Sequence, residues 1–265
     1  MAAMTDYPYI SSADNSRFKT LRKLALNSRE RRKQGKTLLD GVHLLDALAD
    51  AGEEVELIIL RQGAEEEREI QACLTRFGDS EGIILSPALF DTLSPVKTPT
   101  GVLALYRPPR PRPPQNEKCA LLLENIQDPG NIGAILRTAA AARVDTVYLS
   151  RGCAEAWSPK VMRAAMGAHF VTTIFEQQNL EEIAPRFPML IATTLDGEQP
   201  LYELDLSGNV ALLLGNEGAG LSPRLTALAS HRVTIPMPGK IESLNVAAAA
   251  AVCLFERVRQ MNGGR

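Results

Sequence analysis

The chain has 265 residues, 45% of them hydrophobic and 23% charged, with a formal net charge of −2. This length suffices for two folded domains, and the composition excludes an intrinsically disordered chain. Scattered cysteines and histidines exclude a zinc site or a disulfide framework, and the lack of a secretory signal or a membrane-length apolar stretch favours a cytoplasmic protein with no metal and no membrane partner.

The N-terminal segment is expected to be a disordered tail over residues 1–16, followed by a basic block. Residues 17–36 hold nine basic residues against one acid, Glu30. The spacing of apolar residues predicts an amphipathic helix there, carried by Phe18, Leu21, Leu24 and Leu26. The block either neutralises nucleic-acid phosphates or is a solvated helix face, and the charges alone leave both interpretations open. The candidate nucleic-acid-binding residues are Arg17, Lys19, Arg22, Lys23, Arg29, Arg31 and Arg32.

A small α/β domain is predicted over residues 17–106. After the basic helix we expect strands at 37–40, 55–60, 82–85 and 101–106, and helices at 43–51, 65–77 and 87–93. This alternation predicts a three-layer α/β module. The next segment, 107–114, has five prolines in eight residues. It predicts a stiff Pro/Arg-rich linker over 107–117, whose arginines can contact phosphates.

The alternation of strands and helices resumes over residues 118–265, which we expect to form a second, larger α/β domain. Strands are predicted at 119–124, 146–149, 171–174, 189–194, 210–214 and 232–235, and helices at 132–142, 159–166, 180–186, after 222 and at 245–259. The apolar strands indicate a mostly parallel sheet buried on both faces. Ligands of such sheets bind where the carboxyl ends of the strands meet. Three of the predicted strands are followed, at their carboxyl ends, by loops with polar or glycine-rich sequences.

The first loop, residues 125–133, leads into an apolar helix that carries one arginine. Asn131 is predicted to cap this helix. Arg137 lies six residues further on among alanines and isoleucines. A guanidinium in that position either binds an anion such as phosphate through two parallel hydrogen bonds or lies at the rim of the helix with its charge in water.

The second and third loops combine glycines with a few polar side chains. Glu217 lies between Gly215 and Gly220. The glycines of this loop follow the order Gly-x-x-Gly-x-Gly, which matches neither the dinucleotide fingerprint nor the P-loop. The third loop places Ser243 and Asn245 before an alanine-rich helix. Asn245 is expected to be its N-cap, and the alanines allow close packing of another helix, as in a subunit contact.

Three motifs, taken in this order, resemble those of the SpoU (TrmH) branch of the SPOUT RNA methyltransferases. They are Asn131-x-Gly-x-x-x-Arg137, Gly215-Asn-Glu217-Gly-x-Gly-Leu221 and Ile235-Pro-Met-x-x-x-x-x-Ser243-Leu-Asn245. The resemblance covers residues 119–259 and implies that 118–265 is the methyltransferase catalytic domain, while the front half resembles the substrate-binding domain of the family less strongly. It implies an α/β fold with a deep trefoil knot, a homodimer, and S-adenosyl-L-methionine (AdoMet) as methyl donor to a ribose 2′-hydroxyl in RNA.

The resemblance also assigns roles to residues. Those implied to bind AdoMet are Thr194, Leu214, Gly215, Gly220, Ile235, Met237 and Leu244. Arg137 is implied to act at the target hydroxyl, and the other catalytic positions are Asn131, Glu217, Ser243 and Asn245, which order the loops, the arginine and the ribose. Because arginine is a poor base, we expect Arg137 to orient a phosphate and stabilise the developing alkoxide.

The choice of substrate rests on the domain layout. A substrate-binding module in front of the catalytic domain is similar to family members that act on ribosomal RNA, so 23S rRNA is preferred to tRNA. The alternatives are a tRNA ribose 2′-O-methyltransferase and a non-catalytic RNA-binding or ribosome-assembly protein on the same fold. A nucleotide-dependent oxidoreductase is disfavoured because no Gly-x-Gly-x-x-Gly follows an early strand.

Overall fold

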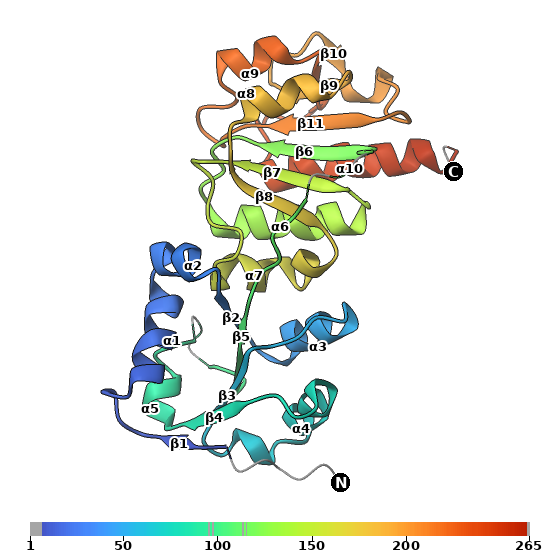
Figure 1. The fold of residues 1–265 in the computed structure, drawn as a ribbon. Helices are drawn as coiled ribbons and strands as arrows, with labels where there is room; N and C mark the ends of the chain where they lie inside the picture. The colour runs from blue at the N-terminus through green and yellow to red at the C-terminus, as the bar shows by residue number, and fades with distance from the viewer. Residues whose placement is uncertain (1–6, 95, 97, 113, 115, 264–265) are drawn as a thin grey trace. The chain divides into compact units, whose positions relative to one another are not determined.

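The computed structural model describes residues 7–94, 96, 98–112, 114 and 116–263, which fall into two compact units (Figure 1). The first unit comprises the chain up to Arg110 together with residues 157–170, and the second comprises 111–156 and 171–265. Each unit is an α/β structure around its own sheet. Among the described residues, no helix has the length and apolar character needed to cross a bilayer.

The sheet of the first unit has the order β1-β4-β3-β5-β2, with β5 antiparallel to both of its neighbours. Its strands are β1 (Tyr9–Ile10), β2 (Thr37–Asp40), β3 (Leu57–Arg61), β4 (Gly82–Leu85) and β5 (Val102–Tyr106). Its helices before the linker are α1 (Ser16–Leu26), α2 (Ser28–Gln34), α3 (Val42–Asp50), α4 (Arg68–Leu74) and α5 (Pro87–Phe90). One hydrophobic cluster holds residues of α3 and α4, and another holds residues of α1 and α5. The predicted three-layer arrangement is present.

The beginning of the chain differs from the expected disordered tail. Residues 1–6 lie outside the described residues, but β1 pairs in parallel with β4, and Ile10 is buried. The predicted basic helix is also divided in two, because Asn27 ends α1 and caps α2. Phe18, Leu21 and Leu24 are buried as expected, whereas Leu26 is 69% exposed at the end of α1. Pairing with a strand 75 positions away, as between Tyr9 and Ile84, is not visible in the local sequence.

Residues 157–170 pack on the first unit although they follow the linker. They contain α7 (Pro159–Ala165) and the 3₁₀ turn η3 (Ala168–Phe170). The Thr37 hydroxyl donates a hydrogen bond to the Trp157 carbonyl (2.7 Å), and Met162 is fully buried in the cluster of α3 and α4. Gly167 has a φ of +87°, and a Cβ there would lie 2.6 Å from the Ala47 Cβ, so only glycine permits this close approach.

The sheet of the second unit has the order β10-β12-β9-β11-β6-β7-β8, and all of its pairs are parallel. The strands are β6 (Cys119–Leu123), β7 (Thr146–Ser150), β8 (Thr173–Gln178), β9 (Leu190–Thr193), β10 (Gln199–Pro200), β11 (Val210–Leu214) and β12 (His231–Thr234). The helices are α6 (Pro129–Ala141), α8 (Leu180–Ile183), α9 (Pro223–Leu228) and α10 (Val246–Met261). The edge strand β10 was not predicted.

Both faces of this sheet are covered. Ala120, Leu122 and Leu213 pack in one cluster with residues of α8 and α9. Their neighbours of opposite parity, such as Leu121 and Leu212, are also fully buried. α6 and α10 pack against each other elsewhere in this unit. The continuous apolar strands therefore correspond to a parallel sheet without a solvent face, as predicted.

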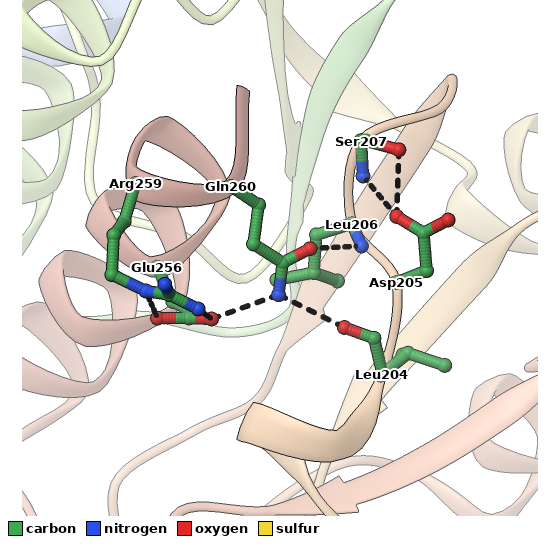
Figure 2. A network of polar contacts seen from close by, with 7 residues as sticks. All are labelled: Leu204, Asp205, Leu206, Ser207, Glu256, Arg259 and Gln260. Atoms are coloured by element: carbon green, nitrogen blue, oxygen red, sulfur yellow. Dashed lines mark hydrogen bonds and ion pairs between the residues drawn. The ribbon is translucent and has the colours of Figure 1, made fainter. Parts of the chain in front are cut away.

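The last turns of α10 are fixed to the chain before β11 by a polar network (Figure 2). The Gln260 side chain accepts a hydrogen bond from the Leu206 N–H (2.7 Å) and donates one to the Leu204 carbonyl (3.0 Å). It also donates to Glu256, whose carboxylate receives two further hydrogen bonds from Arg259. Hydrogen bonds from Arg259 to the carboxylate hold the pKa of Glu256 below its usual value. The network anchors the end of the helix that begins at the third loop.

Candidate active site

The three predicted loops come together at the carboxyl ends of strands in the sheet of the second unit. β6 and β11 pair in register with Leu123 opposite Leu214, so that they end at the same level. The Glu124 N–H then donates to the Leu214 carbonyl (2.9 Å). The first loop therefore starts directly beside the second.

Asp128, not Asn131, caps the helix that follows the first loop. Its carboxylate accepts a hydrogen bond from the Asn131 N–H (2.8 Å), and Pro129 occupies the first helical position, as is common for proline. The predicted cap was therefore wrong by three residues. Because Asp128 caps the helix, the Asn131 side chain is free to contact the other two loops.

Asn131 joins the three loops through its side-chain amide. Its Nδ2 donates to Glu217 Oε1 in the second loop (2.5 Å), and its Oδ1 accepts from Asn245 Nδ2 in the third loop (2.9 Å). Hydrogen bonds to a carboxylate are stronger than those between neutral groups. The polar residues of the three motifs thus form one chain, Glu217–Asn131–Asn245.

Asn245 uses its two side-chain atoms for different purposes. Its Oδ1 accepts hydrogen bonds from the N–H groups of Ala247 (2.9 Å) and Ala248 (3.3 Å), so it is the predicted N-cap of α10. Its Nδ2 makes the contact with Asn131. The start of α10 is thereby tied to the first loop.

The second loop is a tight turn held by backbone contacts. Asn216 and Gly220 exchange two backbone hydrogen bonds, and the Asn216 side chain accepts from the N–H groups of Gly218 and Ala219. A Cβ at Gly215 would lie 2.3 Å from the Gly220 carbonyl carbon, so no other residue fits there without moving the turn. These glycines allow the backbone itself to form a wall of the site.

A cavity of about 1030 Å³ opens beside these loops. All seven residues predicted to bind a cofactor line it, namely Thr194, Leu214, Gly215, Gly220, Ile235, Met237 and Leu244. Glu217 and Ser243 line it as well. The Thr194 hydroxyl oxygen is buried, and within the described part of the chain it has no hydrogen-bond partner. A buried hydroxyl at a cavity wall fits a polar ligand that completes its hydrogen bonding.

Arg137 is exposed on α6, and no hydrogen bond or ion pair to it is recorded among the described residues. Of the five predicted catalytic positions, contacts connect Asn131, Glu217 and Asn245, Ser243 lines the cavity, and Arg137 alone stands apart. Its guanidinium is therefore available to a ligand, since it pairs with none of the described carboxylates. Both predicted interpretations, an anion site and a solvated rim residue, are compatible with this position.

The basic block is largely exposed, with one exception. Arg31 is buried, and its guanidinium donates to the carbonyls of Leu24 (2.6 Å) and Ala25 (3.1 Å) at the end of α1. It is thus placed to hold α1 and α2 together. The exposed predicted RNA-binding residues are Arg17, Lys19, Arg22, Lys23, Arg29 and Arg32. Of these, Lys19 pairs with Asp14 and Arg17 lies 3.9 Å from Glu81.

The cysteines are placed as structural residues. All four are free and buried. Burial raises the pKa of the Cys119 thiol to about 11 and those of Cys73 and Cys253 to about 12. A protonated, buried thiol is a poor nucleophile and a poor metal ligand. In the described ranges, no group of three or more His, Cys, Asp or Glu residues is arranged to hold a metal ion.

Three site residues were missed from the sequence: Asp128, Asn216 and Asn125. The Asp-Pro-Gly order is a helix-start signal that identifies Asp128 as a cap. Asn216 organises the second loop and also donates from Nδ2 to the Asn125 carbonyl (2.9 Å). That contact spans 91 residues, and no local pattern signals it.

Comparison with known proteins identifies this arrangement. Residues 118–255 match the SpoU rRNA Methylase family, and residues 15–104 match the MRM3-like substrate binding domain. The chain belongs to the SpoU rRNA methylase family. The family match covers all three loops, and the second match covers the first unit from the start of α1 to β5.

Relatives and solved structures of the SpoU family span nearly the whole chain. RlmP of Bacillus subtilis, a 23S rRNA (guanosine(2553)-2′-O)-methyltransferase, is 30% identical over 93% of this chain and 97% of its own length. An uncharacterized tRNA/rRNA methyltransferase of Synechocystis is 33% identical over 97% and 95%. The SpoU methyltransferase AviRb of Streptomyces viridochromogenes in complex with AdoMet has a TM-score of 0.87 at 28% identity, covering 95% of this chain and 100% of that one.

Proposed function

We propose that this chain transfers a methyl group from AdoMet to a ribose 2′-hydroxyl in RNA, with 23S rRNA as the substrate. The observation that carries the proposal is the chain of contacts Glu217–Asn131–Asn245 beside a cavity lined by every predicted cofactor residue. The relatives named as 23S rRNA 2′-O-methyltransferases support the same reaction.

The large cavity fits the methyl donor. Its volume of about 1030 Å³ exceeds what a ligand of this size needs. Thr194 offers a buried hydroxyl without a partner in the described chain, and the turn from Gly215 to Gly220 offers close access to backbone groups. AdoMet, when bound, supplies an electrophilic methyl group on a sulfonium.

The residues of this chain have the remaining tasks: to align the ribose and to favour loss of its proton. Asn131 fixes the first loop against the other two, and Arg137 follows on the helix that this loop begins. With no recorded internal partner among the described residues, the Arg137 guanidinium is available to an RNA phosphate or to the developing alkoxide. Ser243, on the cavity wall, and Glu217 complete the polar side of the site.

The exposed cations of α1 and α2 provide the RNA contact in this proposal. Arg22, Lys23, Arg29 and Arg32 have no recorded ion-pair partner among the described residues, and such cations bind phosphates with release of counterions. The match of residues 15–104 to a substrate binding domain supports this role. It also favours rRNA over tRNA, because the first unit is an additional module in front of the methylase region.

Three further features belong to the proposal. We expect the carboxyl-terminal part of the second unit to thread a trefoil knot, the active form to be a homodimer, and the protein to act in the cytoplasm. The alanine-rich start of α10 is compatible with a subunit contact. Sedimentation of the purified chain tests the dimer directly.

The decisive experiment maps ribose methylation in all stable RNAs from cells with and without the protein. We expect one 23S rRNA ribose to lose its methyl group. Purified protein with tritiated AdoMet then restores it in vitro, while Arg137→Ala binds AdoMet normally and transfers no methyl group. A lost methyl group in tRNA supports the tRNA alternative. No change in any RNA contradicts the proposed reaction, and full activity of Arg137→Ala contradicts the role proposed for Arg137.

A further inference from the structure

A second, smaller cavity lies in the same unit and is not used by the mechanism above. It has a volume of about 400 Å³ and is formed at the carboxyl ends of β6, β7 and β8 and by α8 and α9. Its charged and polar lining side chains are Glu124, Asn125, Ser150, Arg151, Gln178, Asn179, Glu181 and Arg224. The volume falls in the range of sites that enclose a small ligand or part of a larger one.

The cavity is lined by a buried carboxylate and by exposed arginines. Glu124 is only 9% exposed, and its carboxylate accepts a hydrogen bond from the Ser222 N–H (2.7 Å). Arg151 is exposed, and no partner is recorded for it among the described residues. The Arg224 side chain is 83% exposed and lies 3.9 Å from Glu181, a separation at which a surface ion pair contributes little. A ligand with N–H donors at one end and an anion at the other fits this arrangement.

The wall of the cavity is fixed before any ligand binds. Asn125 has a φ of +54°, a conformation that is uncommon for a residue with a side chain. The Ser150 hydroxyl holds it by accepting from the Asn125 N–H (2.9 Å). At Gly152 a Cβ would lie 2.0 Å from Asn125 Oδ1, so a larger residue there requires the Asn125 side chain to move.

The smaller cavity shares a wall with the larger one. Asn125 lines the smaller cavity and Asn216 the larger, and the Asn216 side chain donates to the Asn125 carbonyl (2.9 Å). α9 contributes to both, with Arg224 on the smaller side and Thr226 on the larger. A molecule in the smaller cavity is therefore a direct neighbour of whatever occupies the methylation site.

We propose that the smaller cavity binds one nucleotide of the substrate RNA next to the nucleotide that is methylated. Its phosphate contacts Arg151 and Arg224, and an N–H edge of its base faces Glu124. This inference rests on the proposed RNA methylation, because the nucleotide that adjoins the methylated one in the RNA chain must lie close to the cavity that holds the methyl donor. The pairing of guanidinium with phosphate and of carboxylate with base N–H groups follows the geometry of these groups.

A binding experiment tests the chemistry of the cavity without the reaction. S-adenosylhomocysteine first fills the larger cavity, and guanosine monophosphate, guanosine and inorganic phosphate are then titrated by calorimetry. We expect the nucleotide to bind more tightly than guanosine or phosphate, since it alone reaches both ends of the cavity. Arg151→Gln is expected to reduce nucleotide binding to the level of guanosine. Equal binding of the nucleotide to Arg151→Gln and the unmodified protein overturns the proposal.

Kinetics with RNA provide the second test. Loss of one charged hydrogen bond predicts a KM for RNA raised roughly tenfold in Arg151→Gln and in Arg224→Gln, with kcat and AdoMet affinity unchanged. Arg143→Gln is the matched control, because Arg143 is also an exposed arginine but precedes β7, at the strand end opposite to the cavity. An unchanged KM in both cavity variants, or an equal rise in Arg143→Gln, contradicts the proposal.

The two proposals fail in different ways. Normal methylation with normal KM values in both cavity variants removes the nucleotide site and leaves the methyltransferase intact. If the protein binds the nucleotide through Arg151 but methylates no RNA, the proposed methyltransferase activity is refuted and the proposed nucleotide site is supported.

Discussion

The contact between Asn245 and Asn131 can be separated from the helix cap by one substitution. Asn245→Ser keeps an oxygen that accepts from the start of α10 and removes the amide that donates to Asn131. Asn245→Ala removes both. We therefore expect Asn245→Ser to retain the free energy of unfolding and Asn245→Ala to lose about 1 kcal/mol of it, the usual value of an N-cap side chain.

Both variants are expected to lose activity by a similar factor. The hydrogen bond between the two asparagines contributes about 0.5–1.5 kcal/mol, and that from Asn131 to the Glu217 carboxylate about 1.5–3 kcal/mol. Asn245→Ser removes the first and loosens the second. A loss of about 1–3 kcal/mol of transition-state stabilisation lowers kcat/KM roughly 5- to 150-fold.

The assay measures tritiated methyl transfer to RNA beside urea unfolding of the same preparations. Ser158→Ala is the matched control, since it removes the N-cap hydrogen bond of α7 without touching the three loops. It should lose about as much stability as Asn245→Ala and keep full kcat/KM. The reasoning is refuted if Asn245→Ser methylates RNA at the rate of the unmodified protein, or if Ser158→Ala loses as much activity as Asn245→Ser.

Three further outcomes are expected. Gly215→Ala forces the second loop to move and should weaken AdoMet binding in calorimetry, whereas a Cβ at Gly208 has open space, so Gly208→Ala should bind normally. The pKa of Glu256 is lower in the folded protein than its unfolded value near 4.5, so the charged carboxylate adds stability above that pH, and this stability disappears as the pH falls through the folded pKa. Glu256→Gln should therefore be less stable than the unmodified protein at pH 7 and equally stable in acid, as measured by urea unfolding. Replacing Arg29 and Arg32 together should reduce the salt slope of RNA binding by about 0.7–0.9 for each lost phosphate contact.

Regular elements were predicted well because periodicity and helix signals are local. The buried strands β6 and β11 appear as continuous apolar runs and were found within one residue of their ends. β8 was placed too early. It runs over Thr173–Gln178, and its register shift next to Gln177, at a φ of +60°, has no sequence pattern of its own.

Tertiary partners explain what the sequence could not predict. Arg31 looks like its neighbours in the basic block, yet its guanidinium is buried against α1. α7 has the same apolar periodicity as other crossover helices, but packing of Met162 joins it to the first unit. Asn131 has partners 86 and 114 positions away, and only the motif resemblance indicated that the three belong together.

The composition of the site has a consequence for its pH dependence. The loops are fixed by two amides, Asn131 and Asn245, and by backbone groups around Gly215, none of which titrates in the working range, together with the Glu217 carboxylate that accepts from Asn131. Arginine likewise keeps its charge there. Loop geometry and phosphate orientation should therefore stay constant from neutral to mildly alkaline pH. A rise of kcat with pH in that range then reports removal of the proton from the ribose hydroxyl, and Arg137→Lys, which keeps a cation but loses the planar fork, should lower kcat at every pH without shifting the profile.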